Sequence, residues 1–446
     1  MQAAATRRPT QRTAIELCDF IHRLSWADAP EHVRVRVLAL VRDMAAVCAA
    51  GRRTPVAALG VEYAHQQHVG KEATLLFDGT GASASGAALA NGLLANALDF
   101  DDGHRLVSGH PGAVVIPAAL AAAQRAGASR AETLAAILLG YEVAIRAGLE
   151  LHARSDSFHY HATGAWGSIG AAAAAARLFG LDTGQIAHAL GLAEYHAPIA
   201  LVMRSAAEPA MTKDGCAWGA YVGVSSALLV EHGFTATSSR FADDRSAHDD
   251  LGREWRVEQI YVKPFPCCRW THAALEAACA LKRDHRIRAD DIRQVVVRTF
   301  AAADELGKGT VTNSEEAQYS VAWPVAAALV RGDFGVEHSV EPGILDPAVA
   351  ALRERVELVV DKTFSDAYPA RRFAEVLLRM HDDEVLRSGI FEPRGEPEDE
   401  RWEDVIETKV ARHAPWLIST GGRTSRDTPQ GLEPFAWLLE ESAGNA

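Results

Sequence analysis

The chain contains 446 residues, 48% of them hydrophobic and 7% aromatic, and it carries a formal net charge of −13. This length exceeds that of one typical domain, so we expect two, and a negative chain without a long basic run excludes nucleic acid and membrane as expected partners. Residues 1–13 lack the apolar core of a secretory signal, no apolar run is clean enough to span a bilayer, and the six cysteines form no C-x-x-C pair. We therefore expect a cytoplasmic protein.

The first half of the chain, residues 12 to about 235, is predicted to form one helix after another. Small and apolar residues recur there at helical spacing, which favours closely packed helices. One helix is expected to end at Gly180, and Asp182 is expected to cap the N-terminus of the next helix. The predicted helices span 33–48, 82–98, 112–125, 131–149, 164–179 and 182–194.

The sequence pattern changes near residue 235, where a polar, acidic stretch is expected to be a linker or loop. Strand-like segments follow at 257–262, 295–300, 356–360 and 373–378, with helices at 271–282 and 315–331 between them. Two last helices, 402–413 and 434–441, are expected to return to the first domain. The predicted fold class is mainly α: a large all-α helical domain of residues 1–254, completed by residues 400–446, plus a smaller α+β lid domain of residues 255–399.

The densest group of ionisable side chains lies between two apolar helical segments. Asp99, Asp101 and Asp102 end the first segment, and His104 and His110 follow in a glycine-containing loop. Acids and imidazoles are costly to bury without partners, and histidine can take or give a proton near neutral pH. The group is therefore predicted to be a reaction site, although any single Asp can instead serve as a helix cap.

The residues of this group carry a family resemblance. The chain reads N-G-L-L-A-N-A-L-D-F-D-D-G-H from Asn91 and H-P-G-A from His110, which resembles the MmgE/PrpD family. Four further blocks follow in the family's order: H-A-T-G-A-W-G from His161, M-T-K-D-G from Met211, K-P-F-P-C-C-R-W-T-H from Lys263 and A-Q-Y-S from Ala317. The family includes 2-methylcitrate dehydratase, cis-aconitate decarboxylase and iminodisuccinate epimerase. The resemblance implies a homodimer, a small polycarboxylate substrate, no organic cofactor and no metal.

The resemblance also implies site residues at the matching positions. The catalytic residues implied are Asp99, His110, His161, Lys213 and His272. The substrate-binding residues implied are His104, Lys263, Arg269, Tyr319 and Trp323. Lysine and arginine suit substrate carboxylates, which arginine can bind bidentately. Adjacent cysteines cannot easily chelate one zinc ion, so Cys267 and Cys268 are expected to be packing residues.

Three positions depart from the family's pattern. Gly103 stands where the family often has Thr, Cys216 where a histidine is common, and Trp323 where the decarboxylases appear to have Tyr. The Trp-bearing loop that follows the acidic motif in the family's methylcitrate dehydratases is also missing. The change at Gly103 removes one expected hydroxyl contact to substrate. The change at Trp323 disfavours a cis-aconitate decarboxylase, and the missing loop disfavours a strict 2-methylcitrate dehydratase.

The implied residues fit the making and quenching of a carbanion beside a carboxylate. A His or Lys removes the proton, cationic groups offset the enolate charge, and a second imidazole protonates a leaving hydroxyl. The first hypothesis is dehydration or hydration of a 2-methylcitrate-like hydroxy acid, followed by epimerisation and then by decarboxylation. Other classes are a class II terpene cyclase using the D-x-D-D of Asp99, Asp101 and Asp102, a metal-dependent hydrolase, and a non-catalytic helical scaffold.

Overall fold

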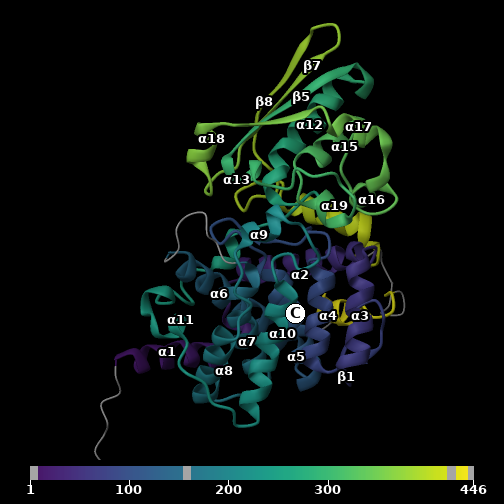
Figure 1. Cartoon of the computed structure of the whole chain (residues 1–446). Helices are drawn as coiled ribbons and strands as arrows, with labels where there is room; N and C mark the ends of the chain where they lie inside the picture. Colours follow the sequence, from purple (N-terminus) through teal and green to yellow (C-terminus); the bar gives the residue numbers. More distant parts are fainter. Residues whose placement is uncertain (1–8, 154–161, 419–427, 440–446) are drawn as a thin grey trace, which may run out of the picture.

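The computed structural model describes residues 9–153, 162–418 and 428–439. Its larger part is a bundle of helices, drawn in purple to teal in the lower half of Figure 1. These helices are α1 (Pro9–Arg23), α2 (Glu31–Gly51), α3 (Pro55–Gln67), α4 (Ala84–Ala95), α5 (Pro111–Ala126), α6 (Arg130–Ala153), α7 (Thr163–Leu178), α8 (Thr183–Tyr195), α9 (Val202–Ala207), α10 (Cys216–Glu231) and α11 (Arg240–Asp243). The six helices predicted by range are confirmed, and Asp182 caps α8 in a capping box with Gln185.

Small residues bring the central helices together. A Cβ on Gly170 of α7 would lie 2.4 Å from the carbonyl oxygen of Gly140 on α6, so only glycine permits this approach. Ala171–Ala176 of α7 are fully buried. The high alanine and glycine content of this half therefore translates into short distances between helix backbones.

The larger part also contains four short strands. A hairpin of β1 (Val69–Thr74) and β2 (Gly81–Ala82), which the helical pattern did not predict, follows α3. The predicted strand 257–262 is mostly wrong: Arg256–Gln259 form a 3-10 helix, and only β4 (Ile260–Tyr261) is a strand. It pairs with β3 (Gly103–His104), so it joins the acidic loop to the second half of the chain.

The smaller part, green in Figure 1, contains a four-stranded sheet in the order β6-β5-β7-β8. The strands are β5 (Ile292–Thr299), β6 (Val356–Val360), β7 (Ala374–Met380) and β8 (Val385–Phe391). Only β5 and β6 are parallel. The helices are α12 (His272–His285), α13 (Ala301–Asp304), α14 (Ser314–Gln318), α15 (Ala322–Arg331), α16 (Val336–Ser339), α17 (Pro347–Arg353) and α18 (Lys362–Ala367). Strand β8 was not predicted, because Arg387-Ser-Gly389 interrupts its apolar pattern.

The predicted helix 315–331 is two helices, α14 and α15. Pro324 explains the break: within one continuous helix its ring would clash with the carbonyl of residue 320, and it has no N–H to donate. The chain turns at Tyr319–Val321 instead. Tyr319 and Trp323 are therefore not neighbours on one helix face.

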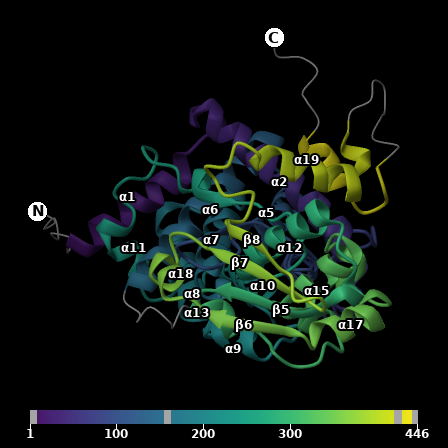
Figure 2. The same ribbon diagram turned by 90° about the horizontal axis from the view of Figure 1, so that it is seen from above.

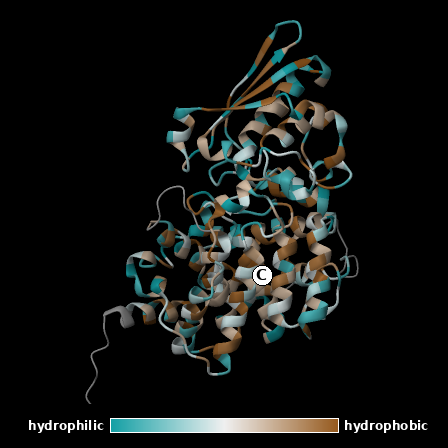
Figure 3. Ribbon diagram, in the orientation of Figure 1, coloured by the Kyte–Doolittle hydropathy of each residue, from teal (hydrophilic) through white to brown (hydrophobic). Residues whose placement is uncertain are grey.

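Two hydrophobic cores hold the structure together. The first gathers the helical bundle with residues as far as Val262, with Val336 and Val340, and with the two C-terminal helices, α19 (Trp402–His413) and α20 (Glu433–Leu439). The second contains Ala206 of α9 and buried residues from Phe265 to Met380. Figure 3 shows hydrophobic residues along the sheet strands and on the bundle helices. The mainly α fold class with a smaller α+β part is confirmed, while the exact boundaries at 254 and 399 stay predictions.

Helix α19 returns to the larger part as predicted. It packs against α2, with the Arg36 guanidinium 3.5 Å above the Trp402 ring and the indole N–H donating to the carbonyl oxygen of Ile260 at 3.0 Å. Figure 2 shows α19 beside α2 from above. Among the described residues, no helix has the length and apolarity that crossing a membrane requires.

Candidate active site

A narrow cavity of about 30 Å³ lies where the two parts of the chain meet. The residues that line it from the larger part are Asp99, Ser108, His110, Val202, Ala206 and Asp214. Those from the second half of the chain are Tyr261, Cys268, Arg269, Trp270, Tyr319 and Arg372. Because both parts supply its walls, movement of one against the other would open or close it to water.

Backbone strain is concentrated at this cavity. Asp99, Ser108 and Lys213 adopt left-handed φ angles of 50°, 45° and 40°, which residues with a Cβ adopt at a cost of about 1–3 kcal/mol each. Gly215, at φ 67°, ends the Lys213 turn just before α10. This turn leaves Lys213 and Asp214 buried at the bundle's edge. Strain that persists at three neighbouring positions is typical of a functional site.

His110 lies at the centre of a carboxylate cluster. Its Nε2 is 3.3 Å from Asp99 Oδ1 and 3.3 Å from Asp214 Oδ2, and its Nδ1 is 3.2 Å from Asp101 Oδ2. Burial lowers the pKa of His110, but the carboxylates of Asp101 and Asp99 outweigh it and hold that pKa well above 6.5. The raised pKa favours the imidazolium form, which can donate from both nitrogens.

Asp101 and Asp102 support this histidine from behind the cavity. Asn96 donates its side-chain N–H to Asp101 at 3.0 Å, while Asp102 accepts the Tyr141 hydroxyl and, at 3.0 Å, the Gly112 N–H. Burial raises the pKa of Asp102 to about 7. These contacts anchor the start of α5, and neither carboxylate lines the cavity.

Two lysines are enclosed beside the same cluster. Lys263 donates to Asp99 Oδ1 at 2.7 Å and to the Asp99 carbonyl at 2.8 Å, so its ammonium and that carboxylate form a buried ion pair. Burial raises the pKa of Asp99, but Lys263 and His110 outweigh it and lower that pKa below 3.8. Lys213 donates to the carbonyl of Ala97 at 2.7 Å and to Gln318, and burial lowers its pKa.

The smaller part adds a tyrosine and a cationic wall. The Tyr319 hydroxyl donates to Asp214 Oδ2 at 3.0 Å, and burial followed by Asp214 raises the pKa of that hydroxyl well above 10. Arg269 donates to Glu396 at 3.0 Å, and Arg372 lines the cavity beside it. The cavity thus combines a proton donor, carboxylates and guanidinium groups, which suits an anionic substrate.

The oxygens of Asp99 and Asp214 and a nitrogen of His110 lie within 4.8 Å of one another, close enough to approach one cation. One observation favours an ion pair over a metal centre. The Lys263 ammonium lies 2.7 Å from Asp99 Oδ1, where it already offsets the charge of that carboxylate. The arrangement fits a cationic acid stabilised by carboxylates.

The predicted site residues divide into three groups. Asp99, His110, Arg269 and Tyr319 line the cavity. Lys263 donates to Asp99 from behind, and the Lys213 ammonium lies 6.0 Å from the centroid of the Tyr319 ring. His104 and His272 are buried and do not line it: His104 pairs with Gln259 at 3.0 Å and His272 contacts Arg269 at 3.2 Å. His161 lies outside the described residues.

Trp323 lies apart from the cavity lining. Its indole is buried in the core of the smaller part, donates to the carbonyl of His338 at 3.2 Å and does not line the cavity. The break between α14 and α15 separates it from Tyr319. Cys268, in contrast, was expected to be a packing residue but lines the cavity, while Cys267 is a core residue as expected.

The position of Trp323 yields a stability prediction without a kinetic one. We expect Trp323→Phe to lower the free energy of unfolding by about 1 kcal/mol, because the His338 carbonyl loses its donor. The kinetic constants should stay within about twofold, since no cavity contact changes. Denaturant unfolding and steady-state kinetics of the variant check both statements. A large loss of kcat at unchanged stability would show instead that Trp323 takes part in substrate binding or catalysis.

Eight residues of the cavity lining were not predicted as site residues, and the polar ones among them include Ser108, Asp214, Tyr261 and Arg372. Asp214 directly follows Lys213 in the quoted M-T-K-D-G block, so the block itself contained the signal. Tyr261 precedes Lys263 by two residues. Arg372 belongs to no block, and no pattern in the sequence distinguishes it from the other arginines.

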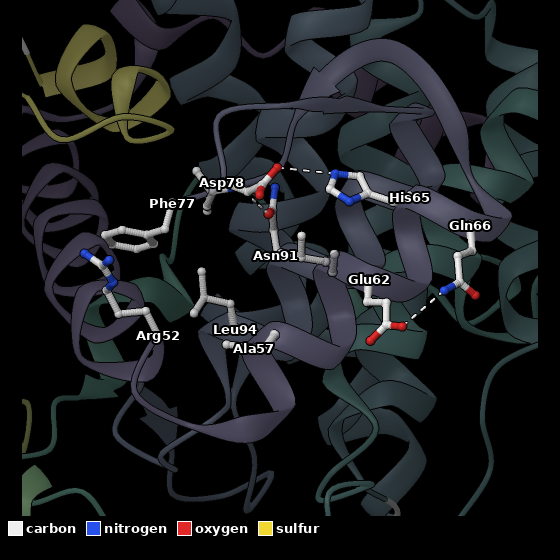
Figure 4. Close-up of a pocket in the computed structure, with 13 residues that line it drawn as sticks. Arg52, Ala57, Glu62, His65, Gln66, Phe77, Asp78, Asn91 and Leu94 are labelled. Atoms are coloured by element: carbon white, nitrogen blue, oxygen red, sulfur yellow. Dashed lines mark hydrogen bonds and ion pairs between the residues drawn. The ribbon is translucent and has the colours of Figure 1, made fainter.

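A larger pocket lies elsewhere, between α3, α4 and the loop after β1 (Figure 4). Its polar groups bind one another: His65 Nε2 lies 3.3 Å from Asp78, Gln66 donates to Glu62 at 3.2 Å, and Asn91 accepts the N–H of Leu76. These paired groups are typical of a polar surface. The chemistry therefore points to the cavity at His110.

The chain is similar to known proteins along most of its length. The sequence profile of the MmgE/PrpD N-terminal domain matches residues 15–254, and that of the MmgE/PrpD C-terminal domain matches residues 265–428. The chain is 25% identical over 427 residues to a cis-aconitate decarboxylase-like protein of Aspergillus oryzae, covering 87% of each chain.

Two further relatives name different reactions. A cis-aconitate decarboxylase of Aspergillus terreus is 25% identical over 359 residues, covering 71% of each chain. A mitochondrial 2-methylcitrate dehydratase of Yarrowia lipolytica is 30% identical over 120 residues, covering 26% of this chain and 23% of its own. Both profiles, in order along the chain and together covering most of it, identify the protein as a member of the MmgE/PrpD family.

Proposed function

We propose that the protein is a lyase that eliminates water from a small hydroxy polycarboxylate related to 2-methylcitrate, or adds water in reverse, without an organic cofactor. One observation carries the proposal: the His110 imidazole and the Asp214 carboxyl group lie 3.3 Å apart on the wall of one cavity. An imidazole and a carboxylate that face one bound substrate can serve as the acid and the base of an elimination. The lyases among the relatives support the reaction class.

The proposed reaction begins at the carbon beside a substrate carboxylate. Asp214 accepts the proton from that carbon, and the electron pair left behind spreads into the carboxylate, whose added charge Arg269 offsets. The bond from the neighbouring carbon to its hydroxyl then breaks as the double bond forms. His110 gives its Nε2 proton to the departing oxygen, which leaves as water. Transfer of the proton from Asp214 to His110 restores the resting state.

Proton NMR of the purified protein in D2O tests this proposal. The panel contains 2-methylcitrate, citrate, cis-aconitate and iminodisuccinate, each incubated with the wild type and with His110→Asn. We expect the wild type to convert a hydroxy acid into its unsaturated product and the variant to be much slower. Conversion of every hydroxy acid at equal rates by both proteins would contradict the assigned role of His110.

Decarboxylation is the second candidate, and the two Aspergillus relatives favour it. The residue that set this chain apart from decarboxylases, Trp323, does not line the cavity and therefore does not count against this reaction. In this case the carbon–carboxylate bond breaks, carbon dioxide leaves, and His110 donates its proton to the carbon that keeps the electron pair. Loss of carbon dioxide from cis-aconitate in the same NMR panel identifies this reaction.

The same NMR panel and the contacts of the acidic motif separate the remaining alternatives. Deuterium uptake with inversion and no loss of water or carbon dioxide would identify an epimerase. For a terpene cyclase the acidic motif should face an apolar pocket. Here Asp99 is paired with Lys263, and Asp101 and Asp102 bind Asn96 and Tyr141 outside the cavity lining.

The pH dependence of turnover follows from the raised pKa of His110. The active form is the imidazolium, so activity is present below that pKa and is lost as pH rises through it. We expect Asp101→Asn to move this alkaline limb to lower pH, because the variant loses the carboxylate that raises the pKa most. Profiles of kcat/KM against pH measure the shift. An unchanged alkaline limb in the variant would assign that limb to another group.

A further inference from the structure

Cationic side chains of two kinds lie in the cavity lining or directly behind it. Lys263 and Lys213 direct their ammonium groups at Asp99, Gln318 and backbone carbonyls, so protein atoms already use these donors. Arg372 differs: it is 2% exposed, and its Nε and Nη1 have no hydrogen-bond partner among the described residues. Buried donors without partners are costly unless a ligand satisfies them.

The surroundings of Arg372 leave positive charge in excess. Its Nη1 lies 3.6 Å from Glu396 Oε1, beyond hydrogen-bond length, while Arg269 donates to the same carboxylate at 3.0 Å. One carboxylate therefore faces two guanidinium groups that line the cavity, and the Nε of Arg269 is also without a partner in the described part of the chain. An anion bound there would complete both sets of donors.

Tyr261 lies close to both arginines. Its ring centroid is 4.7 Å from the Arg269 guanidinium and 5.5 Å from that of Arg372. A Cβ on Gly103 would lie 2.3 Å from the Tyr261 hydroxyl, so this tyrosine position requires glycine at 103. The family often has Thr there, and the Tyr261 hydroxyl fills the space of that missing side chain in this protein.

We propose that Arg372, Arg269 and Tyr261 form a subsite for a second carboxylate of the substrate, distinct from the carboxylate beside the reacting carbon. The subsite selects polycarboxylates over monocarboxylates and over analogues with one carboxylate fewer. The inference rests on the proposed function, because it assigns the binding of the same substrate. Its test uses binding of an acid that cannot react, so turnover is not required.

Isothermal titration calorimetry with propane-1,2,3-tricarboxylate and with pentanedioate, its counterpart without the middle carboxylate, measures the subsite. We expect the wild type to prefer the tricarboxylate and Arg372→Gln to bind it about 10–100-fold more weakly, with that preference lost. Arg372→Lys keeps the charge but lacks the planar guanidinium group. Its affinity for the tricarboxylate should therefore lie between those of the wild type and Arg372→Gln. Tyr261→Phe should weaken binding about 2–10-fold.

Arg371→Gln is the matched control, because Arg371 is the exposed neighbour that pairs with Glu392. It should bind both acids like the wild type, and thermal unfolding confirms that each variant is folded. Equal affinity of wild type and folded Arg372 variants, or no binding of the tricarboxylate by the wild type, would overturn the subsite. Intact binding selectivity without turnover of any polycarboxylate would instead refute the proposed function alone.

Discussion

Replacing His110 with Asn is expected to lower kcat by about 10²–10⁴-fold, the range by which a positioned general acid accelerates a reaction. The variant keeps a side chain of similar shape but cannot supply the proton that leaves with the hydroxyl. KM should change less, because the cavity's guanidinium groups remain. Steady-state kinetics on the acid identified by NMR measures the loss.

A matched control separates catalysis from stability. His248 is 6% exposed, close to the 7% of His110, and bonds only the carbonyl of Ala242 in the hydrogen bonds that the structure records for its ring. His248→Asn should therefore cost stability without changing kcat. If both histidine variants lost activity in proportion to their loss of folded protein, His110 would be a structural residue and the acid would lie elsewhere.

The second large effect concerns Lys263. We expect Lys263→Met to lower the free energy of unfolding by about 3–5 kcal/mol, because Asp99 would keep a buried charge without its ammonium partner. Activity should fall as well, since Asp99 contacts His110. Denaturant unfolding, followed by circular dichroism, measures the change.

The double variant Lys263→Met/Asp99→Asn tests this explanation. It removes the uncompensated charge, so it should recover part of the stability that the single variant loses, while its activity stays low. If the losses of stability caused by the two single substitutions simply added in the double variant, Lys263 would act through packing and not through the ion pair.

The candidate site was predictable where its residues lie in contiguous blocks. Asp99 and His110 flank one loop, Lys213 sits in a short turn, and Arg269 follows Lys263 within one β-to-helix segment. Local sequence therefore specified both the residue types and their closeness. His104 belongs to the same loop as His110, yet its ring bonds Gln259 away from the cavity, and the spacing alone could not show this.

The errors have a common physical origin in the folding of distant segments. Tyr319 and Trp323 are four apart, which puts them on one face of a continuous helix. Pro324 breaks that helix, so Tyr319 reaches Asp214 and Trp323 enters the core. Arg372 lies 262 residues beyond His110 in the chain and reaches the cavity only because the segment before β7 passes over it.

The sequence by itself determined the family, the mainly α fold class, most helices and the loop with the general acid, because periodicity and short motifs are local properties. Only the tertiary structure decided which side chains face the cavity, which lysines are already paired, and that Asp214, Tyr261 and Arg372 join the site. Those features depend on contacts between segments far apart in sequence. Protonation does too: the carboxylates of Asp101 and Asp99, which folding brings around one imidazole, raise the pKa of His110.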